Sequence, residues 1–200
     1  DLSQLNGAYR NLLEGVNATL DSIVVCLDNI PMPLQFMDPE FQVQFLNRAA
    51  QDMLHVKSAD VDGASCGALW NTALCNDRER CPCAIAMNTS EVQTTDLSCC
   101  SHGKQYNMHA VSAALHASNG DLTGCFEILI DQTSLKQSME KSRRTAEYQN
   151  RAVQKLTECL TQLAEGDLTV FFDVPEGDEW VRETEQTFNQ LADTLSLSLK

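Results

Sequence analysis

Apolar residues near the start of the chain recur at three- and four-residue steps, and two prolines end the pattern. The repeat runs from Leu5 to Ile30 and predicts a helix with one apolar stripe, as in a coiled coil. Two consecutive four-residue steps interrupt a strict heptad and would locally unwind a supercoil. The alternative to a coiled-coil helix is an amphipathic helix that packs on the core of its own domain. Pro31 and Pro33 cannot continue the helix, because proline lacks the amide donor. A new domain therefore begins there.

The middle of the chain shows strand patterns separated by turn-forming residues. They cover residues 34–36, 43–46, 91–98, 105–115 and 122–130. Asn47 is a candidate N-cap for a helix over 48–54, and a short helix is expected over 82–87, with proline in its first turn. Two strands, short helices and three further strands predict an α+β domain of about one hundred residues.

Helical spacing returns at Ser134 and is interrupted once. The pattern stops at Gly166-Asp167, crosses an extended piece broken by Pro175, and resumes at Asp178. Helix, connector and helix suit a parallel bundle formed by two chains. Because a lone helix cannot bury an apolar stripe, the helices at both ends predict a parallel homodimer.

Charge and hydropathy exclude several classes of partner. The chain has 28 acidic and 14 basic residues, and its net charge of −14 would repel nucleic acid and anionic membrane surfaces. The longest apolar runs are far shorter than the ~20 residues that cross a bilayer. Since the chain begins and ends inside helical patterns, we expect it to be part of a longer protein, whose other parts could include membrane spans.

Four of the nine cysteines, Cys66, Cys75, Cys81 and Cys83, fall within eighteen residues. Four thiolates can hold zinc or an iron-sulfur cluster, although the Cys-x-Cys pair is less typical of metal sites than Cys-x-x-Cys. The alternatives are a reversible thiol-disulfide switch, or small buried hydrophobic residues. Cys99-Cys100, beside His102, could add a ligand or pair with the group. Non-covalent heme held through His109 is a lesser hypothesis.

A ligand pocket would be lined by apolar residues that face inward from the sheet and helices. The candidates are Phe36, Leu54, Trp70, Met87, Met108 and Phe126. Polar groups for such a pocket could come from Tyr106, Asn107 or His109. The alternative is that these side chains only form the core.

Residues 29–131 resemble a PAS domain, and three local motifs in this stretch and directly after it carry the resemblance. They are Asn29-Ile30-Pro31-Met32-Pro33, Asn47-Arg48-Ala49-Ala50, and Asp131-Gln132-Thr133. The resemblance implies a five-stranded antiparallel sheet with short helices. It also implies that Asp131 and Thr133 couple the sheet to a signalling helix, which is compatible with ordinary helix capping. The cysteine group resembles that of a cysteine-rich PAS variant from anaerobic bacteria.

The two ends of the chain resemble parts of methyl-accepting chemotaxis proteins. Residues 164–169, 178–179 and 188–191 are similar to a HAMP module, and residues 7–10 and 15–21 resemble a helix of receptors with serial HAMP units. The resemblance implies four segments: an N-terminal signalling helix over 1–30, a PAS-like sensor over 31–133, a linker helix over 134–152, and a HAMP-like relay over 153–200.

These resemblances imply the cytoplasmic portion of a bacterial receptor anchored in the inner membrane, which signals through a chemotaxis adaptor and kinase. The PAS domain would sense a small ligand, a metal cluster or a redox state. The alternatives are the equivalent module of a histidine kinase, or a PAS domain that only dimerises and couples. No catalytic triad, phosphate-binding loop or hydrolase motif occurs, so we expect no enzyme activity.

Overall fold

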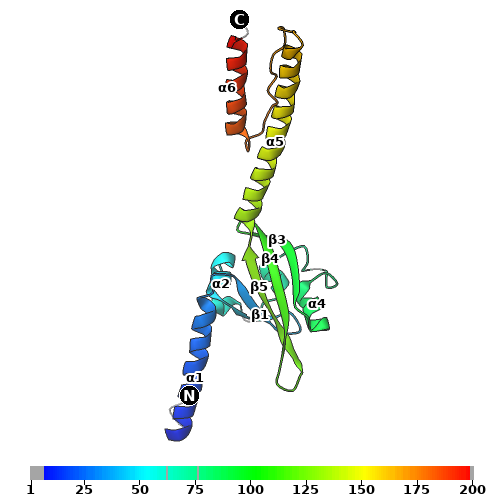
Figure 1. Ribbon diagram of the computed structural model, residues 1–200. Coiled ribbons are helices and arrows are strands. Elements are labelled where there is room, and N and C mark those ends of the chain that lie inside the picture. Colours follow the sequence, from blue (N-terminus) through cyan, green and yellow to red (C-terminus); the bar gives the residue numbers. More distant parts are fainter. Residues whose placement is uncertain (1–6, 62, 76, 199–200) are drawn as a thin grey trace. The chain divides into compact units, whose positions relative to one another are not determined.

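The computed structural model describes residues 7–61, 63–75 and 77–198, and the chain divides into two compact units, Asp1–Thr133 and Ser134–Lys200. Figure 1 shows the first unit as a sheet with α2 and α4 beside it, preceded by the long helix α1. Its helices are α1 (Gly7–Asp28), α2 (Arg48–Leu54), η2 (Ser58–Asp60), α3 (Cys66–Trp70) and α4 (Pro82–Thr89). Its strands are β1 (Leu34–Met37), β2 (Val43–Leu46), β3 (Gln93–Ser101), β4 (Lys104–His116) and β5 (Leu122–Asp131).

The N-terminal helix ends close to the two prolines, as the sequence predicts. α1 ends at Asp28, while residues 1–6 of the predicted helix, including Leu5, lie outside the described residues. Its apolar stripe is exposed, with Leu12, Val16 and Leu20 each more than 45 % accessible. No helix within the described ranges has the length and apolar character needed to cross a bilayer.

The five strands pair antiparallel in the order β2-β1-β5-β4-β3, which confirms the predicted five-stranded sheet. β5 is central and pairs with β1 on one side and β4 on the other. Gly124 makes the close approach to β1 possible, because a Cβ there would lie 2.0 Å from the Met37 carbonyl oxygen and its φ is +148°. Strand β5 is therefore paired with a neighbouring strand along both of its edges.

Side chains alternate between the two faces of the sheet, and the short helices cover one of them. The larger core cluster joins Val43, Leu46, Met108 and Leu129 of the strands to Ala50 and Leu54 of α2 and Trp70 of α3. A smaller cluster joins Met37 and Cys125 to Cys83, Ala86 and Met87 of α4. The core of the first unit thus lies between one sheet face and α2, α3 and α4.

A buried asparagine ties three elements together. Asn47 is fully buried, and its Oδ1 accepts hydrogen bonds from the backbone amides of Leu34 (2.9 Å) and Ala50 (3.0 Å). Its Nδ2 donates to the carbonyls of Leu27, Ile30 and Met32 at 2.9–3.1 Å. The predicted N-cap of α2 is therefore also the group that fixes the end of α1 and the start of β1.

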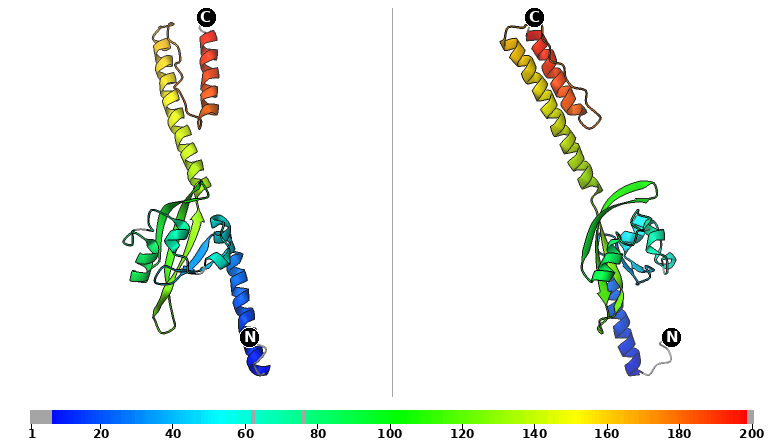
Figure 2. Two further views of the ribbon diagram at one scale, coloured as in Figure 1. Left: turned by 180° about the vertical axis from the view of Figure 1, so that it is seen from behind. Right: turned by 90° about the vertical axis from the view of Figure 1, so that its right-hand side faces the viewer.

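The second unit is a helix, a connector and a second helix. α5 (Thr133–Ala164) begins at the border of the units, and α6 (Arg182–Ser198) runs in the same direction as α5 after the connector has returned along it (Figure 2). The Tyr148 hydroxyl donates to the Pro175 carbonyl (2.8 Å), and Tyr148 packs with Ala152, Val181 and Phe188. The connector's contacts reach into residues 134–152, which the sequence assigns to a linker helix.

Replacement of Asn47 by alanine is expected to lower the free energy of unfolding by about 2–4 kcal/mol, because a helix cap is lost and several buried backbone groups lose their partner. Urea denaturation followed by circular dichroism measures this. Asn88→Ala is the matched control, since Asn88 is exposed on α4, and it should change the free energy of unfolding by less than about 0.5 kcal/mol. An Asn47→Ala variant as stable as the wild type would contradict the role assigned to this side chain.

Candidate functional site

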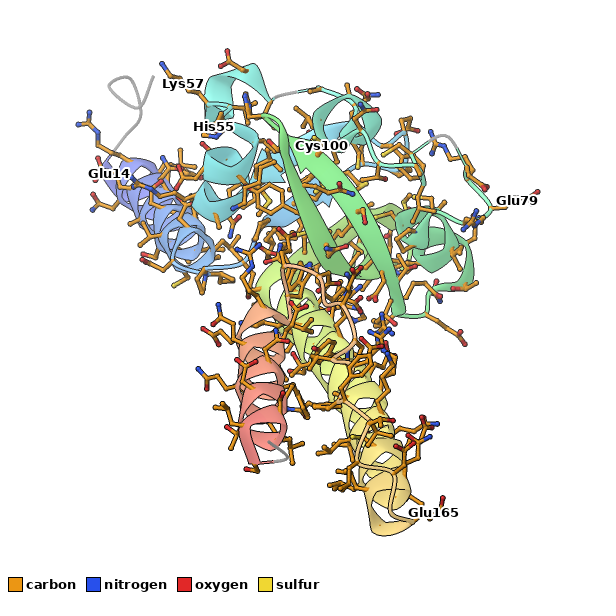
Figure 3. All side chains as sticks on the ribbon, turned by 90° about the horizontal axis from the view of Figure 1, so that it is seen from above. Glu14, His55, Lys57, Glu79, Cys100 and Glu165 are labelled. Atoms are coloured by element: carbon orange, nitrogen blue, oxygen red, sulfur yellow. The ribbon has the colours of Figure 1, made fainter. Side chains whose placement is uncertain are left out.

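A cavity of about 380 Å³ lies on the helix-covered face of the sheet in the first unit. Its walls come from the turn between β1 and β2, helix α3, the segment between α3 and α4, the first residues of α4, and strands β3 and β5. Figure 3 shows Glu79 at the outer edge of the segment between α3 and α4. All four grouped cysteines line this one cavity: Cys66, Cys75, Cys81 and Cys83.

Three polar side chains form a row across neighbouring strands at the floor of the cavity. Gln35 of β1 and Ser112 of β4 are the cross-strand partners of Glu127 on β5. Gln35 Nε2 donates to Glu127 Oε2 (2.7 Å) and the Ser112 hydroxyl donates to Glu127 Oε1 (3.0 Å). All three side chains are buried, and Glu127 also lines the cavity. The sheet thus delivers a carboxyl group to the inside of the domain.

Trp70 determines the orientation of the Gln35 side-chain amide in this row. Its indole Nε1 donates to Gln35 Oε1 (2.9 Å), and an indole N–H can only donate. The Gln35 oxygen must therefore face Trp70, and its amide nitrogen must face Glu127 and the Cys66 sulfur at 3.4 Å. The Cys83 thiol in turn donates to the Ser112 hydroxyl (3.4 Å). Every neighbour of Glu127 in this row presents a donor to it.

Burial dominates the electrostatics of the cavity floor. It raises the pKa of Glu127, against the hydrogen bonds from Gln35, Cys83 and Ser112, which lower it. Burial also raises the pKa of the Cys66 thiol, and the nearby Glu127 carboxylate acts in the same direction. The floor therefore keeps the Cys66 thiol protonated at neutral pH.

The two cysteines at the start of α4 differ in chemical state. The neighbouring Cys83 thiol lowers the pKa of Cys81 to about 6, and the first backbone amides of α4 act in the same direction, although the Cys81 side chain makes no capping hydrogen bond. Contacts with the Cys125 and Cys81 sulfurs, and then burial, raise the pKa of Cys83. Cys81 is thus the thiolate of the pair, and Cys83 is its protonated partner.

The fourth cysteine of the group packs against the turn after α3. The backbone amide of Thr72 donates to Cys75 Sγ (3.3 Å), and the Thr72 hydroxyl lies 3.2 Å from the same sulfur. Within residues 7–61, 63–75 and 77–198, no three His, Cys, Asp or Glu side chains are placed to hold one metal ion. The four cysteines share a cavity wall in this arrangement without converging on one point.

Only Trp70 of the six apolar pocket candidates lines the cavity. Leu54 and Met108 lie in the larger core cluster, and Met87 lies in the smaller one, as the alternative interpretation predicts. The inward placement of Phe36 and Phe126 is wrong: they lie on the other face of the sheet, where their rings are 6.3 Å apart. The reason is strand alternation, since Gln35 and Glu127 are their neighbours in sequence and face the cavity.

The predicted polar groups on β4 lie elsewhere. His109 faces away from the helix-covered side, and its Nδ1 lies 2.7 Å from Asp96 Oδ1, so it is not placed to hold heme in the cavity. Tyr106 packs beside the larger core cluster. Cys99 is buried in that cluster, which raises the pKa of its thiol, whereas Cys100 is exposed.

Gln35, Ser112 and Glu127 are the functional candidates that the sequence does not reveal. None of the three belongs to a recognisable motif, and β4 and β5 carry other polar residues as well. The only signal is their cross-strand register, which becomes visible once the sheet order is known.

The predicted coupling residues lie where the sheet meets α5. The backbone amide of Thr133 donates to Asp131 Oδ1 (2.8 Å), as in a helix cap. The Thr133 hydroxyl accepts from the backbone amide of Asn107 (2.9 Å), and the Gln132 amide donates to the Asn107 carbonyl (2.8 Å). The start of α5 is therefore bound to β4 as well as to β5.

An antiparallel sheet in the order β2-β1-β5-β4-β3, with short helices around an internal cavity on one face, defines the class of small α+β domains to which PAS domains belong. The family described as "PAS fold" matches residues 27–137, more than half of the chain. The chain belongs to this family.

Several solved PAS-domain structures are similar to part of this chain. The PAS domain of Bordetella pertussis BvgS is 19% identical, with 62% of this chain and 97% of that chain covered and a TM-score of 0.41. A PAS domain from Colwellia psychrerythraea is 13% identical, with 58% and 98% covered and a TM-score of 0.49. The PAS domain of nitrogen regulation protein NR(II) from Vibrio parahaemolyticus is 12% identical, with 54% and 95% covered and a TM-score of 0.45. A comparison with curated proteins found no match.

Because its pKa is about 6, Cys81 should react with iodoacetamide at a rate that rises as the pH passes through about 6 and levels off above about 7.5. Peptide mass spectrometry of the reduced protein at a series of pH values measures this. Cys83→Ala removes the group that lowers the pKa, so the midpoint for Cys81 should move upward, whereas Cys100→Ala should leave it unchanged. A wild-type midpoint above about 8, near that of an ordinary thiol, would contradict the assignment.

Proposed function

We propose that this chain is the sensory and signal-transducing segment of a bacterial chemotaxis receptor. In this proposal the PAS unit registers a stimulus at its cavity, and helix α5 passes the resulting change to a HAMP-like relay over residues 153–200. The observation that carries the proposal is the path of β5: the strand lines the cavity with Glu127 and Leu129 and ends at Asp131, where α5 follows after one residue.

The junction after β5 supports a mechanical link. Thr133 is bound to Asp131 on its own strand and to Asn107 on the neighbouring strand. A change in the sheet around Glu127 therefore reaches the first residue of α5 through backbone-anchored hydrogen bonds. Such a device needs only a two-state equilibrium that the stimulus biases by a few kcal/mol, because a ligand shifts populations by its differential affinity.

The second unit supports the HAMP-like part of the proposal. Its two helices run in the same direction and are joined by an extended connector that packs through Phe172, Pro175 and Val181. Apolar residues remain exposed on both helices, among them Val153 and Leu160 of α5 and Leu191 of α6. A second copy of the chain would cover them in a parallel bundle, and the same holds for the stripe on α1. The proposed functional form is therefore a parallel homodimer.

The resemblance of the N-terminal helix to chemoreceptors favours a chemotaxis adaptor and kinase as downstream partners, through parts of the receptor outside this chain. It also favours a location on the cytoplasmic side of an inner-membrane-anchored receptor. The equivalent module of a histidine kinase is the second candidate. The proposal includes no catalytic step within these residues.

Three kinds of stimulus fit the cavity: a small ligand, a redox change at the cysteines, or a metal or iron-sulfur cluster. The geometry favours a small ligand, because the cavity has volume, apolar walls and a few convergent polar groups. A redox change is the next candidate, since Cys81 and Cys83 are neighbouring thiols in different protonation states.

The junction can be tested by fusing residues 1–200 to the kinase-control region of a chemoreceptor in cells that lack other receptors. Thr133→Val removes the hydroxyl that accepts from the Asn107 amide, and it should change resting kinase output at least about two-fold. Thr133→Ser keeps the hydroxyl and should retain the wild-type output.

Thr145→Val is the matched control for this experiment, because Thr145 is a half-buried residue of α5 whose hydroxyl donates to the Lys141 carbonyl within the same helix. Its output should equal that of the wild type. Equal output from Thr133→Val and wild type, with normal protein levels, would argue against coupling through this junction. Output only from a fusion to histidine kinase catalytic domains would favour the second candidate.

A further inference from the structure

The floor of the cavity presents a buried carboxyl group that has no cationic partner among the described residues. Glu127 is 5 % exposed, its two oxygens accept hydrogen bonds from Gln35 and Ser112, and its other hydrogen-bonding neighbour, Cys83, is an uncharged thiol. Within the described part of the chain, Glu127 forms no ion pair with a lysine, arginine or histidine. Arg78 lines the same cavity, but its guanidinium lies over the Phe41 ring, 3.5 Å from the centroid, and Arg78 itself is exposed.

The hydrogen-bond donors around Glu127 favour its charged form and oppose the effect of burial. The indole N–H of Trp70 forces the Gln35 amide to turn its nitrogen toward the carboxyl group. The Cys83 thiol donates to Ser112, which leaves the serine hydroxyl proton directed at the carboxyl group.

A carboxylate with one donor on each oxygen retains acceptor capacity, because its two oxygens offer about four acceptor sites. Burying its charge is costly unless an opposite charge accompanies it. Since the cavity adjoins Glu127, the missing positive charge can be supplied by whatever enters the cavity.

We propose that the cavity binds a small organic cation, such as an amidinium, guanidinium or protonated amine, whose charged group lies against Glu127. The apolar body of the ligand would lie against Trp70, Leu97 and Leu129, which line the same space. The volume of about 380 Å³ is at the low end of the ~300–1,000 Å³ typical of ligand pockets, so the ligand is compact. This inference deepens the proposed function and rests on the assignment of this cavity as the sensory site.

An organic cation fits the geometry better than a metal ion does. A soft metal would need several of the thiols to converge on one point, and no three ligating side chains among the described residues do so. A planar cation needs only one carboxylate and an apolar wall.

Isothermal titration calorimetry of the 200-residue protein with three nearly isosteric probes tests the charge requirement. Benzamidinium carries a positive charge, benzamide is neutral, and benzoate is negative. Benzamidinium should bind at least about ten-fold more tightly than benzamide, because the hydrogen bonds become charge-assisted, and benzoate should not bind. Methylguanidinium serves as a second, smaller cation.

Glu127→Gln should weaken the binding of the cation about ten-fold or more, since it removes the charge with little change of shape. Glu40→Gln is the matched control: Glu40 lines the same cavity from the turn between β1 and β2 and is exposed, so its loss should change affinity less than about two-fold. If Glu127→Gln fails to fold, the ranking of the three probes on the wild-type protein decides the question.

The proposal is overturned if neither cation binds at concentrations up to about 10 mM, if benzamide binds as tightly as benzamidinium, or if Glu127→Gln keeps the wild-type affinity. Its failure is distinguishable from that of the proposed function. Glu127-dependent binding with no change in kinase output from the fusion would refute the sensory role and leave the binding site. Kinase output that depends on Thr133, without any binding of cations, would refute the binding site and leave the proposed signalling function.

Discussion

The hydrogen-bonded row of Gln35, Glu127 and Ser112 is the interaction on which the interior of the first unit depends. An acidic side chain on the central strand would be expelled from an apolar core if its neighbours offered no donors. Because the three residues are cross-strand partners, the same register that pairs β1, β5 and β4 also satisfies the carboxyl group. The register of these three strands therefore also determines which side chains form the cavity floor.

This constraint explains why the order of elements could be predicted from the sequence while the cavity could not. Helix periodicity, prolines and turn residues are local signals, and they locate α1, the five strands and the break between α5 and α6. Both faces of strand β5 carry apolar side chains: Cys125 and Leu129 lie on one face, and Phe126, Ile128 and Ile130 lie on the other. Hydrophobicity alone favours the face that carries phenylalanine. The other face turns inward nonetheless, and Glu127 is tolerated there because strands distant in sequence supply its hydrogen-bond donors.

The grouped cysteines show a similar division between what spacing predicts and what it cannot predict. Their closeness in sequence predicts a shared location, and the structure places all four around one cavity. Spacing does not specify the chemical state of each sulfur, which depends on neighbours from other elements. Cys83 meets Ser112 and Cys125 of the sheet, Cys66 meets Gln35, and Cys75 packs on the turn after α3. Cys66, Cys81 and Cys83 thereby acquire different proton affinities.

The central position of β5 limits the kind of motion that the first unit could transmit through this strand. A strand that is hydrogen-bonded along both edges cannot slide along its own axis without breaking two ladders at once, and a one-residue slip would also exchange its two faces. Axial displacement of a single strand, of the piston type, is therefore disfavoured. A change in the twist of the whole sheet preserves every pairing, and it rotates the end of β5 instead of advancing it. Any output carried by this strand would accordingly be a rotation.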